Sequence, residues 1–295
     1  MPVRVSHVID TRRKEPELSM PMDFNQQIID EYRANKGQVG GPFEGARLLL
    51  LTTVGARTGA EHTTPLGCLP DGDRMLIIAS AGGAPRPPAW YHNLLANPQV
   101  TVEDGVWTYQ AKAVVLEGEE RERVFARAVE ADPGWGTYQE QSGRVLPVVA
   151  LMPIEFRPPA GTFGDALITM HDGFRRELAL IRAEVARSGP RVVAQLRVNC
   201  LTMCQGLHGH HSKEDAFMFP DLESRHPELA AVMARLRAEH EVIARLLDEL
   251  KTLLAVDDVA PETLLSEVNR LTQELEAHLD YEEEQLVPLL NDLPG

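Results

Sequence analysis

The sequence predicts an α+β domain with a mainly antiparallel sheet or barrel, followed by an all-α four-helix bundle. Two observations predict this division. Up to about residue 157 the apolar residues come in short runs separated by glycine, proline and aspartate, which is typical of strands joined by turns. After residue 165 they recur every three or four residues in four long segments, which is typical of amphipathic helices. A chain of 295 residues is long enough for both domains.

The first half begins with a polar segment, residues 1–22, which we expect to be loose and to precede the first domain at 23–157. Apolar runs predict strands at 46–54, 74–80, 106–116 and 146–156. Gly, Pro and Asp-Gly pairs predict turns at 55–65, 70–73 and 103–105. Helical patterns occupy 23–37, 89–97 and 118–132.

The stretch RPPAGTFG predicts a hinge over residues 158–164. Asp165 is the expected N-cap of the first helix beyond it. The second domain, residues 165–295, carries four helical segments, at 165–188, 191–218, 227–254 and 261–288. Because short connections join them, we predict an up-down-up-down bundle.

Charge and cysteine content restrict the class of protein. The net charge is −15, of which residues 161–295 contribute −11. Such acidity argues against a nucleic-acid-binding protein, and its ordinary interpretation is a solvated helical surface. Three cysteines make no even disulfide framework, so we expect a reducing, cytoplasmic setting. The absence of an 18-residue apolar run and of an apolar signal core predicts no membrane span.

Histidine interrupts the apolar stripe of every predicted helix of the bundle. The stripes are Leu167, His171, Phe174, Leu178, Ile181 and Val185; Cys200, Met203, Leu207, His210, Glu214 and Phe217; Met233, Leu236, His240, Ile243, Leu247 and Leu250; and Val268, Leu271, Leu275, His278 and Glu282. An unpaired buried polar group costs about 1–3 kcal/mol. Six such groups on core-facing seams need a common partner, and a pair of metal ions supplies one.

The spacing of these polar residues supports one shared site. Counted from turns expected near residues 189, 223 and 258, the four histidines lie at nearly the same depth, because each helical residue rises about 1.5 Å. Each His-x-x-x-Glu pair places both side chains on one helix face. The predicted metal ligands are His171, His210, Glu214, His240, His278 and Glu282. Imidazole with carboxylate suits iron, manganese or zinc, and four imidazoles with two bridging carboxylates suit a di-iron pair best.

Only one histidine of the stretch HGHHS lies on the predicted seam. His211 points about 100° away from His210 on a helix, toward a flanking face with Cys204, and we expect His208 and His211 to be supporting or surface residues. Cys200 and Cys204 are interpreted as small core residues rather than a redox pair. At any single position the ordinary alternative, a hydrogen-bonded histidine without a metal, remains open.

These residues resemble the hemerythrin-like, or HHE cation-binding, family over about residues 165–291, in the order His, His-x-x-x-Glu, His, His-x-x-x-Glu. The resemblance implies a non-haem di-iron centre that meets oxygen or changes redox state, with the same six residues as ligands. Ala244 stands where oxygen-carrying hemerythrins have a second histidine after the helix-three ligand. Glu283 stands where they use an aspartate. Both departures argue against reversible oxygen carriage and leave sensing, iron binding or oxidase-like chemistry open.

Two glycine-rich turns of the first domain are candidates for a phosphate site. They are GARTGAEHTTPL and SAGGAPRPPAWYHNLLANP. Backbone amides in such turns bind anions, and the amides of Thr58, Gly59, Gly82 and Gly83 would act with Arg57 and Arg86. Four aromatic residues would flank a planar ring: Trp90, Tyr91, Trp135 and Tyr138. The ordinary alternative is that the turns are only turns and the aromatic residues are core.

The segments LLTTVGARTGAEHTTPL and IIASAGGAPRPPAWYHNLLANPQVTV, with Trp135–Pro147 and PVVAL, resemble the deazaflavin-dependent nitroreductase family over most of residues 23–156. The resemblance implies a split β-barrel that binds reduced coenzyme F-420 and passes hydride to quinones or nitro compounds. It implies Tyr138 as the substrate-side catalytic residue. The cofactor-binding residues it implies are Arg57, Thr58, Gly59, His62, Pro65, Gly82, Gly83, Arg86, Trp90, Tyr91 and Trp135. Ala81 and His62 stand where basic residues are common.

Together these patterns predict a two-domain redox protein: a deazaflavin-dependent reductase of quinone-like or nitro-aromatic acceptors joined to a bundle that binds two iron ions and meets oxygen. Manganese and zinc are the alternative metals. The expected partners are a small-molecule electron acceptor, oxygen and a second copy in a homodimer. The alternative hypothesis is a non-catalytic iron or oxygen sensor whose barrel serves as scaffold or dimerisation unit.

Overall fold

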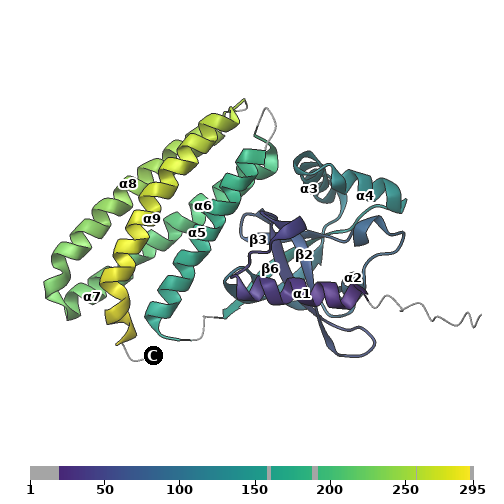
Figure 1. Ribbon diagram of the computed structural model, residues 1–295, viewed down its shortest axis with the longest axis horizontal. Helices are drawn as coiled ribbons and strands as arrows, with labels where there is room; N and C mark the ends of the chain where they lie inside the picture. Colours follow the sequence, from purple (N-terminus) through teal and green to yellow (C-terminus); the bar gives the residue numbers. More distant parts are fainter. Residues whose placement is uncertain (1–19, 158–160, 188–191, 257, 293–295) are drawn as a thin grey trace, which may run out of the picture.

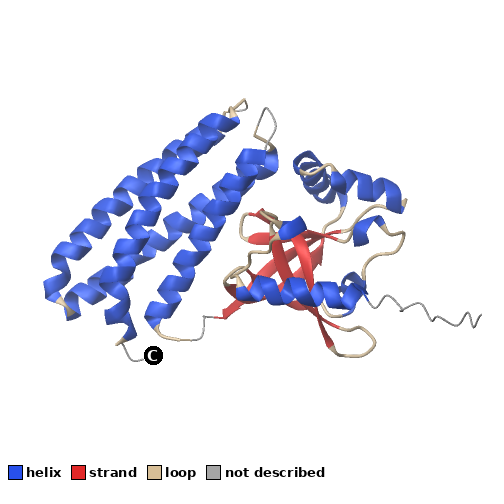
Figure 2. Cartoon of the chain, in the orientation of Figure 1, coloured by secondary structure: helices blue, strands red, loops and turns tan. Residues whose placement is uncertain are grey.

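The computed structural model describes residues 20–157, 161–187, 192–256 and 258–292. A β-barrel and a helical bundle lie side by side (Figure 1), and in the described residues the last strand ends at Arg157 (Figure 2). The predicted fold class, an α+β split barrel followed by a four-helix bundle, is confirmed. Of the polar segment expected at 1–22, residues 1–19 lie outside the described residues.

The barrel is closed and antiparallel throughout, in the order β1-β2-β3-β6-β5-β4. Its strands are β1 (Leu48–Val54), β2 (Glu61–Asp71), β3 (Arg74–Ile78), β4 (Gln99–Asp104), β5 (Trp107–Val115) and β6 (Val148–Arg157). Alternate side chains fill the interior, where Leu49, Leu51 and Val102 are fully buried. The strands β2 and β4 were not predicted.

The predicted turn over 55–65 is wrong from Glu61 onward, because β2 begins there. The prolines in this segment favoured a turn over a strand, yet each lies at a position where β2 pairs with a single strand. Residues 61–67 pair only with β1, and Pro65 lies opposite Leu50. Residues 68–71 pair only with β3, and Pro70 lies opposite Met75. A proline, which has no N–H to donate, is tolerated at such edge positions.

Four helices surround the barrel: α1 (Met20–Ala34), α2 (Ala89–Ala96), α3 (Gly118–Ala131) and α4 (Gly134–Ser142), with short 3-10 turns η1 (Gly41–Phe43) and η2 (Ala81–Gly83). The first three match the predicted helices, whereas α4 was not predicted. The buried Tyr32 joins α1 to the barrel. Its hydroxyl lies 3.1 Å from the carbonyl oxygens of Leu48 and Glu103 and accepts the N–H of Gly105 at 2.6 Å.

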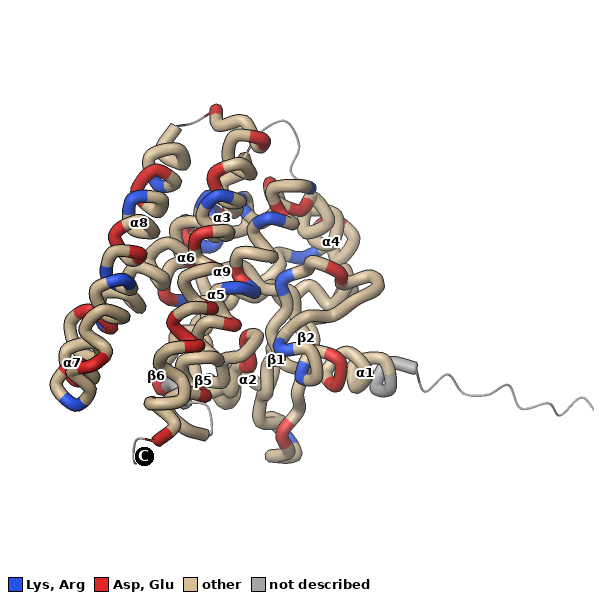
Figure 3. The backbone as a smooth tube through the Cα atoms, turned by 60° about the vertical axis from the view of Figure 1, so that its left-hand side comes forward, with Lys and Arg blue, Asp and Glu red and all other residues tan. Residues whose placement is uncertain are grey.

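The second half forms the bundle. Its elements are α5 (Phe163–Arg187), α6 (Ala194–Lys213), the π-helical turn η3 (Glu214–Met218), α7 (Phe219–Arg225), the 3-10 turn η4 (Pro227–Leu229), α8 (Ala230–Leu254) and α9 (Pro261–Asn291). Acidic and basic residues are interspersed along α8 (Figure 3), while Leu236, Ile243 and Leu247 of the same helix are buried. None of the helices in the described part of the chain is long and apolar enough to cross a membrane.

The N-cap predicted at Asp165 is wrong, because α5 begins earlier, at Phe163. Thr162 precedes the helix. Its N–H donates to Asp165 Oδ2 at 2.8 Å, and the N–H of Asp165 donates to Thr162 Oγ1 at 3.1 Å. This reciprocal pair is a capping box with Thr162 at the cap and Asp165 three residues inside. The helix therefore starts within the hinge expected at 158–164.

The bundle packs against one end of the barrel through buried charges. Arg47, at the entry to β1, forms ion pairs with Glu177 at 2.6 Å and with Glu184. At the end of β2, the carbonyl of Pro70 accepts a hydrogen bond from Gln195 Nε2 of α6 at 2.8 Å. This end of the barrel holds the β2–β3 and β4–β5 turns, since both turns lie at the same ends of the ladder.

Candidate metal centre and cofactor face

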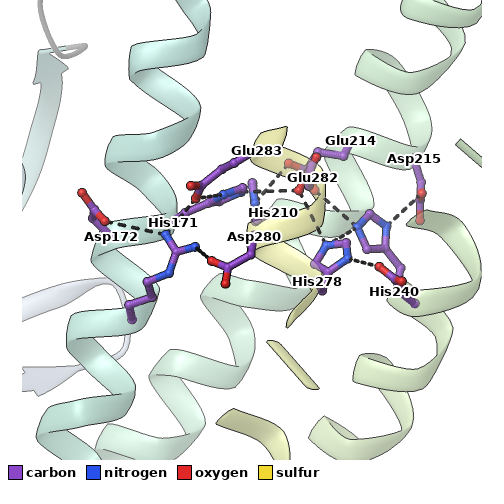
Figure 4. A network of polar contacts seen from close by, with 12 residues as sticks. His171, Asp172, His210, Glu214, Asp215, His240, His278, Asp280, Glu282 and Glu283 are labelled. Carbon is purple, nitrogen blue, oxygen red and sulfur yellow. Dashed lines mark hydrogen bonds and ion pairs between the residues drawn. The ribbon is translucent and has the colours of Figure 1, made fainter. Parts of the chain in front are cut away.

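The bundle buries a layer of histidine and glutamate (Figure 4). The six predicted residues come from α5 (His171), α6 (His210), the first position of η3 (Glu214), α8 (His240) and α9 (His278 and Glu282), and each is at most 7% exposed. The ring centroids of His171 and His210 are 5.2 Å apart, and those of His240 and His278 are 4.7 Å apart. The prediction that the four histidines share one layer is confirmed.

Each glutamate lies between two histidines from different helices. One carboxylate oxygen of Glu214 is 3.0 Å from His210 Nε2, and the other is 3.6 Å from His240 Nε2. Glu282 Oε2 is 3.5 Å from His171 Nε2 and 3.6 Å from His278 Nε2. Two carboxylates in these positions can bridge two cations, one held with His171 and His210 and the other with His240 and His278.

Outer carboxylates hold three of the imidazoles in one orientation. His171 Nδ1 is 2.8 Å from Glu283 Oε1, His240 Nδ1 is 3.0 Å from Asp215 Oδ1, and His278 Nδ1 is 3.0 Å from Glu239 Oε2. A proton on Nδ1 leaves the lone pair of Nε2 directed into the layer, as in carboxylate–histidine–metal triads. Glu283 is thus an outer partner, and Glu282 is the carboxylate that points inward.

Burial makes the neutral forms of these groups the stable ones. It lowers the pKa of His210 to about 2 and of His278 to about 4. It also raises the pKa of Glu214 and of Glu282, each further raised by a neighbouring carboxylate, Glu282 for the former and Glu283 for the latter. Neutral imidazole is the metal-binding form, and a nearby cation would favour the ionised carboxylates.

The layer fits a pair of metal ions, because most of its inward atoms have no hydrogen-bond partner among the described residues. The atoms His171 Nε2, His210 Nε2 and all four carboxylate oxygens of Glu214 and Glu282 are buried without a hydrogen bond among the described residues. His240 Nε2 and His278 Nε2 are 3.2 Å apart. Adjacent ligands about 2.1 Å from one ion are about 3 Å apart. These lone pairs would repel without a cation between them.

The π-helical turn sets which residues of the second stripe face inward. Glu214 starts the turn, is 4% exposed and reaches the layer. The turn adds a residue to the helical period, so the stripe moves. Phe217, predicted on the seam, is 74% exposed, whereas Phe219 is fully buried and stacks on His240 with centroids 5.4 Å apart. The prediction for Phe217 is therefore wrong.

Of the two histidines predicted to be supporting or surface residues, His208 is exposed, and His211 is buried beside His240, which fits the supporting alternative. His211 is 5% exposed, and its ring stacks on that of His240 with centroids 4.1 Å apart. One ligand atom each of His211, His240 and His278 lies within 4.8 Å of the others. A second group of this kind contains His171, His210, Glu214 and Glu282. The seam rule underestimated the burial of His211 because α6 packs against both α5 and α8, and the flanking face that carries His211 meets His240 and His278.

Cys200 and Cys204 are buried free thiols of the bundle core, as predicted. Burial raises the pKa of both, that of Cys204 to about 11. A thiol with a raised pKa is a poor nucleophile and a poor metal ligand. Neither cysteine occurs in the two candidate ligand groups formed by the described residues.

The predicted cofactor residues gather at the other end of the barrel. Arg57, Thr58 and Gly59 form the exposed β1–β2 turn. Asn93 of α2 ties this turn down, since its Nδ2 donates to Thr53 Oγ1 and its Oδ1 accepts the N–H of Ala56, both at 3.1 Å. His62 and Pro65 follow along β2, and Arg86 is exposed just after η2.

The glycine turn η2 has an unusual backbone. Ala81, Gly82 and Gly83 all have positive φ, at 51°, 60° and 82°. A left-handed alanine costs roughly 1–2 kcal/mol, and such strain is typical of functional turns. Helix α4 packs on this turn, so closely that a Cβ at Gly83 would lie 3.4 Å from Tyr138 Cδ1.

Arg144 organises the same turn, and sequence reasoning missed it. Its Nη2 donates to the carbonyls of Ala79 at 2.8 Å and Ser80 at 3.1 Å, and its Nε donates to that of Ala84 at 3.3 Å. Its Nη1 is buried without a partner among the described residues. No motif marked Arg144, because its partners are backbone atoms about 60 residues away.

The aromatic residues divide into two groups. Trp90 is 5% exposed and belongs to the barrel core, so the structure favours the ordinary core interpretation for this residue. Trp135 and Tyr138 contact each other edge to face at 6.2 Å, and Tyr138 is 37% exposed beside η2. Tyr91 is half-buried and meets Trp90 edge to face. Tyr138, Trp135 and Tyr91 therefore remain available to a planar ligand.

Two family models match the chain. Residues 25–153 match F420H(2)-dependent quinone reductase, and residues 162–290 match hemerythrin HHE cation binding domain. An F420H(2)-dependent quinone reductase of Mycobacterium tuberculosis is 40% identical over 124 residues, which cover 41% of this chain and 83% of the relative. A solved structure of an F420-H2 dependent reductase is 40% identical, with a TM-score of 0.34, and the match covers 36% of this chain and 93% of that one.

Proposed function

The chain belongs to the F420H(2)-dependent quinone reductase family through residues 25–153 and carries a hemerythrin HHE cation binding domain in residues 162–290, and on this basis we propose a two-domain oxidoreductase. The first domain uses reduced deazaflavin F420 to reduce a quinone-like or nitro-aromatic acceptor. The second domain holds two iron ions, with manganese or zinc as alternatives. The 40% identity to a quinone reductase is the observation that carries the enzymatic part.

The exposed turns and aromatic residues support the reductase proposal. The anionic tail of the cofactor would lie against the backbone amides of the β1–β2 turn and of η2, with Arg57 and Arg86 as exposed cations. When bound, the deazaflavin supplies a hydride. Tyr138, beside η2, would donate a hydrogen bond to the acceptor oxygen and hold it over the ring.

We expect Tyr138→Phe to lower quinone turnover at least about tenfold, since positioned proton donors contribute that much or more. Affinity for deazaflavin, measured by fluorescence quenching, should stay unchanged. Exposed Val145 on the same segment offers a control substitution, Val145→Ala, which should alter neither quantity. Unchanged turnover in Tyr138→Phe would remove this role for the tyrosine.

The metal proposal depends on the inward atoms that have no other partner in the histidine layer. The ion pair would be held by His171, His210, His240 and His278, with Glu214 and Glu282 between the ions. Metal analysis of the purified chain should find about two irons. Glu282→Gln, which removes one bridging charge, should reduce the metal content, while the exposed neighbour Glu284, changed to Gln, should leave it unchanged. Equal metal content in both variants would contradict the bridging role.

The two sites lie at opposite ends of the barrel. The cofactor turn precedes β2, and the bundle packs at the end of this strand, which has 11 residues. At about 3.3 Å per residue the two ends are roughly 30 Å apart. We propose that reducing equivalents reach the bundle only through a diffusing acceptor. A stopped-flow mix of reduced deazaflavin with ferric protein should then leave the iron bands unchanged until a quinone is added.

A sensor is the second candidate function, favoured by Ala81 and His62, which remove fixed positive charge from the cofactor face. In that case the barrel is a scaffold and the bundle reports iron or oxygen. Deazaflavin fluorescence distinguishes the two. Quenching on addition of the protein favours the reductase, and no quenching at high protein concentration favours the sensor.

A further inference from the structure

Helix α8 provides one histidine to the layer and then an alanine. Ala244 follows His240 by one turn, where a second imidazole on the same face would reach the same ion. A cavity of about 140 Å³ lies here. Its lining residues are His208, His211, Ser212, Asp215, His240, Glu241, Ala244 and Leu247. The second ion of the proposed pair therefore has an open side next to α8.

His211 lies at this open side. It is 5% exposed, its ring is nearly parallel to that of His240 at 11° with centroids 4.1 Å apart, and it meets His278 edge to face at 5.1 Å. Its Nε2 is buried without a hydrogen-bond partner among the described residues. An unpaired buried nitrogen is destabilising, and stacking of the rings does not give it a partner.

The spacing of the three imidazoles suits coordination of one ion. One ligand nitrogen of each of His211, His240 and His278 lies within 4.8 Å of the others. Two ligands on opposite sides of an ion, each about 2.1 Å from it, are about 4.2 Å apart. Shifts of well under 1 Å would bring the nitrogens within that span, and the ring of His211 would also turn out of its stack on His240, because the lone pair of a ring nitrogen lies in the ring plane.

We propose that His211 is a third imidazole ligand of the second metal ion, supplied by α6 in place of a histidine at Ala244. This inference rests on the proposed metal site. The first ion would have two imidazoles, His171 and His210, and the second would have three. The pair would then be asymmetric, with the more open coordination positions at the first ion.

The test is metal binding by the full-length chain, not turnover. Metal-free protein would be loaded anaerobically with Zn²⁺ or Fe²⁺, and both stoichiometry and affinity measured against a competing chelator. We expect wild type to bind two ions. His211→Ala should keep the first ion and bind the second at least about tenfold more weakly, since even outer-shell changes cost 10–100-fold. His208→Ala, three positions away and exposed, is the matched control and should behave as wild type.

A rescue variant separates ligation from a structural role. Adding Ala244→His to His211→Ala should restore the second ion, because the new imidazole would enter the same cavity from α8. His211→Gln, which keeps most of the bulk, should weaken the second ion as His211→Ala does. Far-UV circular dichroism of the metal-free variants checks that the bundle is folded.

Two outcomes would overturn the inference in distinguishable ways. If wild type and His211→Ala bind both ions with equal affinity, the assignment of His211 fails while the dinuclear site stands. If wild type binds fewer than two ions, the proposed metal pair itself fails, and the assignment of His211 fails with it.

Discussion

The histidine layer and the proposed cofactor face hold their candidate binding groups in opposite ways. In the layer the candidate binding groups are side chains that are at most 7% exposed, and most of their inward atoms have no hydrogen-bond partner among the described residues. At the cofactor face the binding groups are exposed turns whose backbone is already held by Asn93 and Arg144. The layer therefore keeps unpaired polar atoms until a ligand binds, whereas the hydrogen bonds that hold the turns of the cofactor face exist without a ligand.

This difference implies that the ligands act differently on the protein. A metal ion in the proposed site would give partners to the unpaired polar atoms of the bundle core, so its binding would contribute to folding. Deazaflavin would bind to a face whose hydrogen bonds exist in its absence, so its binding should add little to stability beyond mass action. Removing or altering each ligand site tests this comparison.

Metal removal should have the largest effect. Chelation should lower the free energy of unfolding of the bundle by about 4 kcal/mol or more, the value for a ligand present at 1,000 times its Kd. Saturation with deazaflavin at ten times its Kd should add only about 1.4 kcal/mol. Chemical unfolding followed by circular dichroism measures both. A chelated protein as stable as the loaded one would contradict the comparison.

Replacement of a buried glutamate should separate two contributions to the free energy of unfolding: the destabilisation by unpaired polar groups in the layer and the stabilisation by bound metal. Glu282→Leu should stabilise the metal-free protein by about 1–3 kcal/mol, because it removes a carboxylate with two unsatisfied buried oxygens. The same change should abolish the ion pair. Glu284→Leu, at an exposed position of α9, is the control and should leave both unchanged. If metal-free Glu282→Leu were less stable than wild type, the idea that the unsatisfied oxygens of Glu282 destabilise the metal-free protein would be contradicted.

The metal-free protein should lose stability as pH rises above neutrality. Burial raises the pKa of Glu214 and Glu282 above the ordinary 4.5, so the folded state holds protons that the unfolded state has released. Stability is then fully present below about pH 4.5 for these groups and falls by about 1.4 kcal/mol per pH unit for each carboxyl that remains protonated. Glu282→Gln should reduce this slope between pH 7 and 8. The metal-loaded protein should lack this loss, because metal binding releases these protons and the unfolded chain holds none of them above neutral pH.

The smallest effect is expected at the cofactor face. Ala81→Gly should stabilise the protein by about 1 kcal/mol, because glycine adopts a φ of 51° without the strain of an alanine. Metal content should not change. Thermal unfolding of the barrel measures the effect, and the exposed Ala56→Gly, in the neighbouring turn, provides a comparison where no positive φ occurs. A destabilised Ala81→Gly would contradict the idea that the positive φ of Ala81 is a strained conformation that glycine relieves.

Regular patterns were readable from the sequence because each depends on neighbouring residues. The stripes of α8 and α9 follow the helical period, so His240, His278 and Glu282 were placed correctly in the core. The strands with continuous apolar runs, such as β1 and β6, were found for the same reason. The strand β2 was missed, because its tolerance of Pro65 and Pro70 depends on which strands lie beside it.

The sequence by itself determined the two fold classes and the meeting of histidine and glutamate in one layer, since a period of 3.6 residues and equal depth suffice for that. The tertiary structure decided that His211 turns inward, that Phe217 turns outward, and that Arg144 holds the glycine turn. It also decided that the bundle packs at the end of the barrel opposite the β1–β2 turn. These features depend on a π-helical turn, on the packing of α6 against α8 and on backbone contacts between distant segments, which no local pattern records.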